Sequence, residues 1–367
     1  MRREIISQVK SLVIKIGTSI LSTNSTIDRL KIERLVEGIN FLLEREFRVC
    51  LVSSGAISSG MSMLGLRTRP KVLPQLQATA AVGQRYLMDL YADAFQKYNR
   101  IVAQILLTQE DLKDRRRYLN IRNTISALWE RRIVPIINEN DTVAVEEIKF
   151  GDNDRLSALV ASLLNIDLLV ILSDVDGFIV EERVLSQIGE ITPELETWAC
   201  GTEKKEICIG GMYSKLEAVK ICFRAGIPCI LANGNRPGIW EKIIKGEEIG
   251  TLFLPSKKKL TSRKQWMLFN LKPKGKIYID RGAREAILNK GKSLLSVGIV
   301  KIEGDFSEAD LVSVFDTEGK KEIAQGISHY SAEELNKIKG LKTSEIEKVL
   351  GYKYYDEVIH RDNLVLL

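Results

Sequence analysis

The sequence predicts an α/β protein: a three-layer αβα sandwich around a mostly parallel sheet, followed by a small β-rich domain. Up to about residue 250, short apolar runs typical of buried strands alternate with segments of helical period. After Leu254, short β-like runs prevail. The length of 367 residues suits two domains, because one domain usually takes roughly 100–200 residues.

The first domain is expected to contain six strands joined by helices. The expected strands are 11–17, 48–53, 101–107, 133–138, 168–173 and 227–232. Helices are expected after the capping residue Asp28, after the glycine-rich turn 53–60, and at 75–98, 117–131, 153–164 and 212–226, the last closed by Gly226. A hairpin is expected at 144–150. Ligands of such sheets bind at the carboxyl ends of the strands, so the turns there (17–19, 53–60, 138–141 and 173–177) form the candidate site.

The C-terminal third differs from the rest in pattern and in charge. Its β-like runs are 276–280, 296–304, 311–316 and 323–331, with short helices at 331–340 and 343–351. We expect a catalytic domain at 8–255, a linker at 256–274, a β-rich domain at 275–355 and a tail at 356–367. From Leu254 onward there are 21 basic and 16 acidic residues, so this part carries most of the net charge of +6.

Composition excludes several classes of protein. A hydrophobic fraction of 45% supports a packed core rather than disorder. No apolar stretch approaches the roughly 18 residues of a membrane span, and the N-terminal MRREIISQVK lacks the apolar region of a signal peptide, so a cytoplasmic protein is expected. The five cysteines contain no CxxC pair, which predicts reduced thiols. The two histidines, His329 and His360, lie near the end of the chain, which argues against histidine-based catalysis in the first domain.

Two lysines stand beside glycine turns at expected strand or helix ends. Lys15 in KIGTS ends an apolar strand, where its ammonium group can meet a phosphate instead of being buried alone. Lys215 in IGGMYSK lies one turn inside a helix that starts at a glycine pair, a position that favours phosphate. The alternatives are a solvent-facing edge lysine and a plain glycine loop. A P-loop is excluded, because Met61 stands where the spacing from Gly55 requires lysine.

A polar cluster separates these lysines in the sequence. It includes Asn138, Asp141, Asn153 and Asp154, on either side of the segment AVEEIKF. Helix capping would explain part of it, but two polar groups exceed what caps need. Together with two lysines, the cluster suits phosphoryl transfer, which needs cations, an acid to position them and a polar acceptor pocket. A carboxylate acceptor, with a reference pKa near 4, is already ionised and needs no histidine base.

Longer motifs give the chain a family resemblance from about residue 12 to its end. The motifs are VIKIGTS (13–19), VSSGAISSGM (52–61), QATAAVGQ (77–84), LLTQEDL (106–112), RRRYLNIRNT (115–124), PIINENDTVAVEEIKFGDNDRLSALVA (135–161), LSDVDG (172–177), GGMYSKLEA (210–218), YIDRGAREAIL (278–288) and EVIHRDN (357–363). In these motifs the sequence resembles the glutamate 5-kinase family, amino acid kinases that carry a C-terminal PUA domain and open proline biosynthesis.

The resemblance implies transfer of the γ-phosphate of ATP, with Mg²⁺ carried by the nucleotide, to the side-chain carboxylate of L-glutamate. It implies that Lys15 and Lys215 grip the transferring phosphoryl group and that Asp154 orients them. It assigns glutamate to Ser54, Asp141 and Asn153. The nucleotide is assigned to Lys15, Ser173 and Asp174 together with Ile209, Gly210, Gly211, Met212, Tyr213, Ser214 and Lys215. No metal ligand is assigned.

The nucleotide loop departs from the family pattern, and the sequence leaves the binding partners undecided. Ile209 replaces a usual threonine and removes a hydroxyl group, whereas Ser173 and Ser214 replace threonines and keep it. The resemblance also implies homo-oligomers and possible feedback inhibition by proline. The alternatives are another phosphotransferase of the same family and an RNA-binding regulatory protein. RNA is not favoured, because the basic C-terminal domain has no arginine-rich or aromatic-interleaved stripe.

Overall fold

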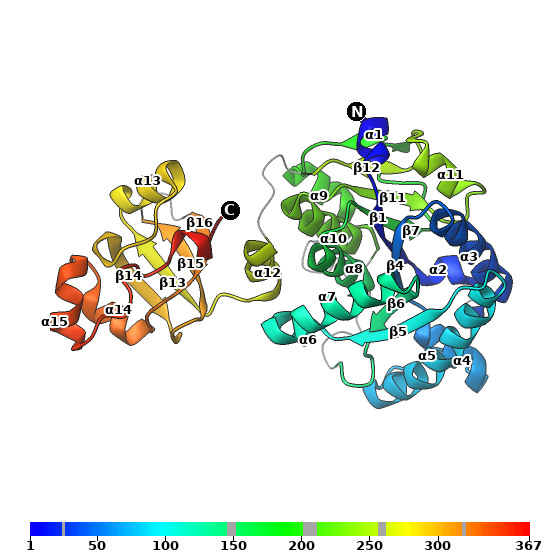
Figure 1. Ribbon diagram of the computed structural model, residues 1–367, viewed down its shortest axis with the longest axis horizontal. Helices are drawn as coiled ribbons and strands as arrows, with labels where there is room; N and C mark the ends of the chain where they lie inside the picture. Colours follow the sequence, from blue (N-terminus) through cyan, green and yellow to red (C-terminus); the bar gives the residue numbers. More distant parts are fainter. Residues whose placement is uncertain (24–25, 145–151, 201–210, 256–261, 318–320) are drawn as a thin grey trace. The chain divides into compact units, whose positions relative to one another are not determined.

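The computed structural model describes residues 1–23, 26–144, 152–200, 211–255, 262–317 and 321–367 (Figure 1). The chain divides into two compact units, Met1–Leu260 and Thr261–Leu367. None of the helices in these described stretches combines the length and the apolar character needed to cross a membrane.

The first unit is built on an eight-stranded sheet in the order β10-β12-β11-β7-β1-β4-β6-β5. The strands are β1 (Ser11–Ile16), β4 (Arg48–Ser53), β5 (Val102–Leu107), β6 (Val134–Glu139), β7 (Leu168–Ser173), β10 (Gln187–Ile188), β11 (Cys229–Asn233) and β12 (Thr251–Phe253). The pairing of β11 with β12 is antiparallel, and the other pairings in this sheet are parallel. Two short hairpins lie outside it: β2 (Ser22–Thr23) with β3 (Thr26–Ile27), and β8 (Ile179–Val180) with β9 (Arg183–Val184).

Helices cover both faces of this sheet (Figure 1). They are α1 (Arg2–Ser7), α2 (Thr18–Leu21), α3 (Arg29–Leu43), α4 (Ala56–Leu64), α5 (Leu73–Gln96), α6 (Gln109–Lys113), α7 (Arg115–Glu130), α8 (Asp152–Leu164), α9 (Pro193–Cys200), α10 (Gly211–Ala225) and α11 (Ile239–Ile244). On one face of the sheet, α3, α5 and α11 pack against it. On the other face, α8 contacts β1, β4, β6 and β7.

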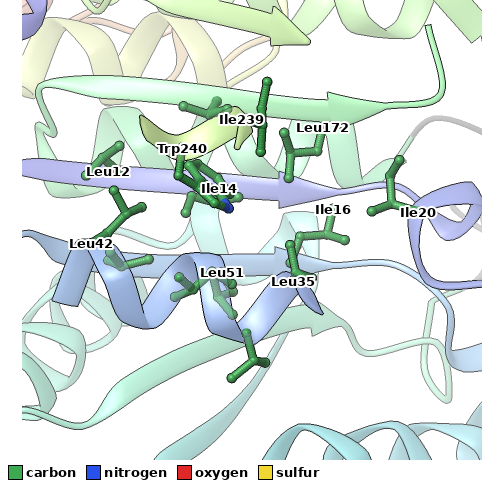
Figure 2. Packing of buried hydrophobic residues seen from close by; sticks show 14 of the residues in the cluster. Leu12, Ile14, Ile16, Ile20, Leu35, Leu42, Leu51, Leu172, Ile239 and Trp240 are labelled. Atoms are coloured by element: carbon green, nitrogen blue, oxygen red, sulfur yellow. The ribbon is translucent and has the colours of Figure 1, made fainter. Parts of the chain in front are cut away.

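Successive side chains of β1 point to opposite faces of the sheet, so the two faces carry different residues. Leu12, Ile14 and Ile16 pack with Leu35 and Leu42 of α3 (Figure 2). Lys15 therefore points to the opposite face, toward α8. The strand thus buries an apolar row on one side and delivers a single ammonium group to the other.

Two glycines let α4 and α5 touch through their backbones. A Cβ atom at Gly60 would lie 1.8 Å from the carbonyl oxygen of Thr79, and one at Gly83 would lie 1.9 Å from that of Ala56. Any side chain at either position would force the helices apart. This contact fixes the start of α4, and with it the turn that follows β4.

The second unit has a five-stranded sheet in the order β14-β13-β15-β16-β17. Its strands are β13 (Gly275–Ile279), β14 (Ile299–Gly304), β15 (Leu311–Asp316), β16 (Glu322–Ile327) and β17 (Leu364–Leu366). Its helices are α12 (Ser262–Asn270), α13 (Arg281–Lys290), α14 (Ala332–Ile338) and α15 (Ile346–Leu350), with short 3₁₀ turns at Ser296–Gly298, Thr343–Glu345 and Arg361–Asn363. The core lies between the sheet and α13, α14 and α15.

The structure confirms the predicted fold class, a mostly parallel αβα sandwich followed by a β-rich unit. All six predicted strands are present, and α10 ends before Gly226, whose φ is +72°. Nearly all of the predicted hairpin 144–150 lies outside the described residues. Sequence reasoning missed α13, which Asp280 caps by accepting a hydrogen bond from the Ala283 N–H at 2.7 Å.

The predicted domain boundaries stay predictions, but two segments near them have regular structure. The region expected as a linker contains α12, whose Met267 is fully buried. The region expected as a tail contains β17, which pairs antiparallel with β16. Both segments lie within the second unit, Thr261–Leu367.

Candidate active site

A cavity of about 410 Å³ opens at the carboxyl ends of β1, β4, β6 and β7. Polar and small residues line it: Lys15, Gly17, Thr18, Ser19, Ser54, Gly55, Ala56, Ile57, Ser58, Arg69, Asn138, Glu139, Asp141, Asn153, Asp154, Ser173, Asp174, Gly211, Ser214 and Lys215. All four turns that the sequence singled out contribute to it. The topology thus gathers segments from positions 15 to 215 around one opening, as expected for a parallel sheet.

Asp154 joins the two lysines at one end of the cavity. Lys15 Nζ lies 2.6 Å from Asp154 Oδ1, and Lys215 Nζ lies 3.6 Å from Oδ2. Ser214 donates a hydrogen bond to Oδ2 at 2.7 Å, and Lys215 Nζ also donates to the carbonyl oxygen of Gly211 at 3.0 Å. Two ammonium groups 200 positions apart in sequence therefore meet on one carboxylate.

The charges at this end stabilise one another. Burial opposes ionisation of Asp154, which is 1% exposed, but Lys15 and then Lys215 outweigh burial and hold the pKa of Asp154 below its ordinary value. Burial also holds the pKa of Lys215 below its ordinary value, and repulsion from Lys15 adds to this against the attraction of Asp154. The cluster suits an incoming polyanion, because two cations face each other across a single negative charge.

A chain of amides positions the neighbouring residue, Asn153. Asn153 Nδ2 donates to Ser54 Oγ and to Asn138 Oδ1, both at 3.0 Å. Asn138 is 3% exposed, and its Nδ2 donates to Gln84 Oε1 of α5 at 2.7 Å. Asn153 Oδ1 is buried without a hydrogen-bond partner among the described residues. Such an acceptor is costly to leave unmet, so it marks a place for a donor on a ligand.

Asp141 lies at the same cavity but in a different setting. Burial raises the pKa of the Asp141 carboxyl to about 6, and the positive charge of Arg69 counteracts burial only in part. Arg69 belongs to the connection between α4 and α5. The lining therefore contains a second pair of opposite charges, Asp141 and Arg69, besides the Lys15–Asp154–Lys215 cluster.

The predicted nucleotide residues fall into three groups. Ser173, Asp174, Gly211, Ser214 and Lys215 line the cavity, and Ser173 Oγ donates to Asp174 Oδ1 at 3.1 Å. Met212 and Tyr213 lie in the first turn of α10 but are not among the lining residues. Ile209 and Gly210 lie outside the described residues, so the effect of Ile209 stays a prediction.

Sequence reasoning did not single out Arg69 or Gln84. Arg69 sits in an irregular, charged connection with no motif around it. Gln84 ends the segment QATAAVGQ and looks like an ordinary helix residue. No local pattern could have found either one, because each reaches the site through the tertiary fold: Arg69 lines the cavity, and Gln84 accepts a hydrogen bond from Asn138 of β6. Across the described residues, no group of three or more His, Cys, Asp or Glu side chains is placed to hold a metal ion.

Comparison with known proteins places the chain among relatives over nearly its whole length. Residues 10–233 match the amino acid kinase family, and residues 275–350 match the PUA domain. Glutamate 5-kinase from Thermoanaerobacter sp. (strain X514) is 50% identical over 97% of both chains. Glutamate 5-kinase from Syntrophotalea carbinolica is 48% identical over 100% of both chains.

Among solved structures, carbamate kinase from Giardia is similar with a TM-score of 0.48 and 18% identity. The similarity covers 68% of this chain and 100% of that one. UMP kinase from Bacillus anthracis gives a TM-score of 0.45 and 14% identity over 67% of this chain and 96% of that one. The full-length identity to curated relatives and the two matched domains confirm the resemblance found in the motifs. The chain belongs to the glutamate 5-kinases of the amino acid kinase family, with a PUA domain after the catalytic unit.

Proposed function

We propose that the protein transfers the γ-phosphate of ATP to the side-chain carboxylate of L-glutamate and so forms L-glutamyl 5-phosphate, the first step of proline biosynthesis. One observation carries the mechanism: Lys15 and Lys215 contact the same carboxylate, Asp154, inside the cavity that also contains Asp141 and Asn153. Near full-length identity of about 50% to glutamate 5-kinases supports the choice of substrate.

The lysines stabilise charge on the group in transfer. Lys15 and Lys215 hold its oxygens from two sides, and Asp154 pairs with both ammonium groups and keeps them in place. A carboxylate oxygen of glutamate forms the new bond to the γ-phosphorus while the bond to the β-phosphate oxygen breaks, and ADP leaves. No proton moves, because the acceptor carboxylate, with a reference pKa of about 4.3, arrives ionised.

Glutamate and nucleotide take opposite sides of this cluster. Ser54, Asn153 and Asp141 bind glutamate, with Asp141 facing the α-ammonium group and Asn153 Oδ1 accepting a hydrogen bond. Ser173, Asp174 and the start of α10 receive the nucleotide. The nucleotide would bring Mg²⁺ on its phosphates, and the ion would supply charge neutralisation there with few ligands from the protein.

The direct test incubates the purified protein with ATP, Mg²⁺ and L-glutamate and traps the acyl phosphate with hydroxylamine. A hydroxamate that forms only with all three components is the expected result. L-Aspartate, N-acetyl-L-glutamate, carbamate and UMP serve as competing acceptors in parallel. Turnover of one of these instead of glutamate would contradict the substrate assignment. RNA binding without phosphoryl transfer would favour a regulatory protein, the alternative from a different class.

Other properties stay proposals drawn from the resemblance. These are a cytoplasmic location, homo-oligomer formation and inhibition by proline. Adding proline to the hydroxamate assay, and measuring mass by light scattering, would test two of them directly.

A further inference from the structure

Seven charged residues line the cavity, and two groups stand out among them besides Glu139 and Asp174. Lys15, Asp154 and Lys215 form the first, joined by ion pairs of 2.6 and 3.6 Å. Asp141 and Arg69 form the second, and the charge of Arg69 is the one that acts on Asp141. Among the lining residues that the structure describes, Arg69 is therefore the cation outside the Lys15–Asp154–Lys215 cluster.

The chain holds the second group together through α5. Arg69 lies four positions before Leu73, where α5 begins. Asp141 lies three positions before Ala144, whose carbonyl oxygen accepts a hydrogen bond at 3.2 Å from Gln77 Nε2 in the first turns of α5. The contact of Gly60 with Thr79 and of Gly83 with Ala56 fixes α4 against the same helix. One helix thus supports both ends of the connection that carries Arg69 and the loop that carries Asp141.

This pair of charges matches the backbone end of an amino acid. An α-amino acid presents an ammonium group and a carboxylate on one carbon atom, so its recognition calls for one anion and one cation side by side. Asp141 supplies the anion. A guanidinium group supplies the cation well, because its paired N–H donors match both oxygens of a carboxylate.

We propose that Arg69 binds the α-carboxylate of the acceptor and that, together with Asp141, it selects an α-amino acid over a plain amine or a plain dicarboxylate. The inference rests on the proposed function, since it names the group of glutamate that Arg69 binds, its α-carboxylate. It makes Arg69 a determinant of substrate specificity rather than a residue of the transfer step.

The test compares Arg69→Ala and Arg69→Lys with a matched control, Arg67→Ala. Arg67 is an exposed arginine of the same connection and does not line the cavity. Each variant is assayed with L-glutamate and with 4-aminobutyrate, which keeps the amine and the reacting carboxylate but lacks the α-carboxylate. The KM for ATP, and thermal unfolding of each variant, show whether nucleotide binding and folding are intact.

Arg69→Ala is expected to raise the KM for glutamate about 10- to 100-fold, the range for a lost charged hydrogen bond, with kcat changed little. Activity with 4-aminobutyrate should be equally poor in the wild type and in Arg69→Ala, because neither can use the missing contact. Arg69→Lys should recover part of the loss, and Arg67→Ala should behave as the wild type.

Two results would overturn the inference while leaving the proposed function intact. One is a wild type that phosphorylates glutamate together with an Arg69→Ala variant no different from Arg67→Ala. The other is an equal loss by Arg69→Ala for glutamate and for 4-aminobutyrate, since that excludes recognition of the α-carboxylate. A wild type that does not act on glutamate would overturn both proposals.

Discussion

Two aspartates in one cavity have pKa values shifted in opposite directions. Asp154 lies against Lys15 at 2.6 Å and Lys215 at 3.6 Å, and these cations overcome burial and lower its pKa. Asp141 is also partly buried, but among the described residues Arg69 is the one charge that acts on it, so burial prevails and raises its pKa to about 6. Residue type is the same at both positions, and the placement of cations decides the difference.

The difference suggests a division of labour between the two ends. A carboxylate that is always ionised suits a structural anchor for two lysines whose positions must not change during transfer. A carboxyl group with a pKa of about 6 suits a group that a bound ammonium ion stabilises in its ionised form. Each of the following variants changes one end and leaves the other as it is.

The largest effect is expected from methionine at Lys15 or at Lys215. Each variant removes a cation from the transferring phosphoryl group, which should lower kcat by about 10²–10³-fold or more. Stability should separate the two. Lys15→Met leaves the buried Asp154 without its 2.6 Å partner and should cost about 3–5 kcal/mol, whereas Lys215→Met removes a partner at 3.6 Å and should cost less. Steady-state kinetics and urea unfolding measure the two properties.

Lys220→Met is the matched control for these variants. Lys220 lies on α10, five positions after Lys215, and pairs with Glu196 and Glu217 outside the cavity. It should retain kcat. Normal turnover in Lys15→Met or Lys215→Met would refute the proposal that both lysines bind the transferring phosphoryl group.

At the other end of the cavity, Asp141→Asn should act mainly on glutamate. The variant keeps the size of the side chain but removes the charge that we propose faces the substrate ammonium group. We expect kcat/KM for glutamate to fall about 10- to 100-fold, while the KM for ATP changes by less than about threefold. A comparable loss for both substrates would show that the two ends are not separate.

The two ends of the cavity also differ in how many of their residues could be predicted from the sequence. Lys15, Asp154 and Lys215 were predictable because each stands in a local pattern with a chemical meaning: a strand end, a helix start or a glycine turn. The alternating strands and helices predicted the parallel sheet, and the sheet brings these patterns to one edge. Function followed from the resemblance in long motifs, since spacing alone could not name glutamate.

Arg69 and Gln84 could not be predicted, because their roles depend on tertiary contacts. Arg69 lines the cavity from the connection between α4 and α5, two helices that are in backbone contact at Gly60 and Gly83. Gln84 acts through Asn138, which lies 54 positions further along the chain. The helix α13 was missed for a simpler reason: it is short and mostly polar, Ile287 is the one residue that it buries, and the cap at Asp280 marks its start.

The pH dependence should distinguish the two aspartates within the unmodified enzyme. Because the pKa of Asp141 is about 6, this carboxyl is protonated below that pH and loses the charge that attracts the ammonium group. kcat/KM for glutamate should therefore fall as the pH drops through about 6. Bound glutamate favours the ionised form, so kcat should persist to lower pH. Asp154, with its lowered pKa, stays ionised throughout this range. Asp141→Asn should abolish the step in kcat/KM.

The smallest effect is expected from Gln84, which would act on glutamate only through two other amides, Asn138 and Asn153. Its Oε1 accepts from Asn138 Nδ2 at 2.7 Å, and this leaves Asn138 Oδ1 to accept from Asn153. Because Gln84 is partly exposed, water can replace the lost acceptor in Gln84→Ala, so we expect a loss of only about 3- to 10-fold in kcat/KM for glutamate.

Gln84→Glu separates hydrogen bonding from packing at this position. A carboxylate can still accept from Asn138 Nδ2, so this variant should retain most activity, whereas Gln84→Leu, of similar size, should lose at least as much as Gln84→Ala. Gln75→Ala, an exposed glutamine on the same helix, should leave kinetics unchanged. If leucine were tolerated as well as glutamate at position 84, the amide chain would be a packing feature of β6 and α5. The orientation of Asn153 would then have to come from Ser54 alone.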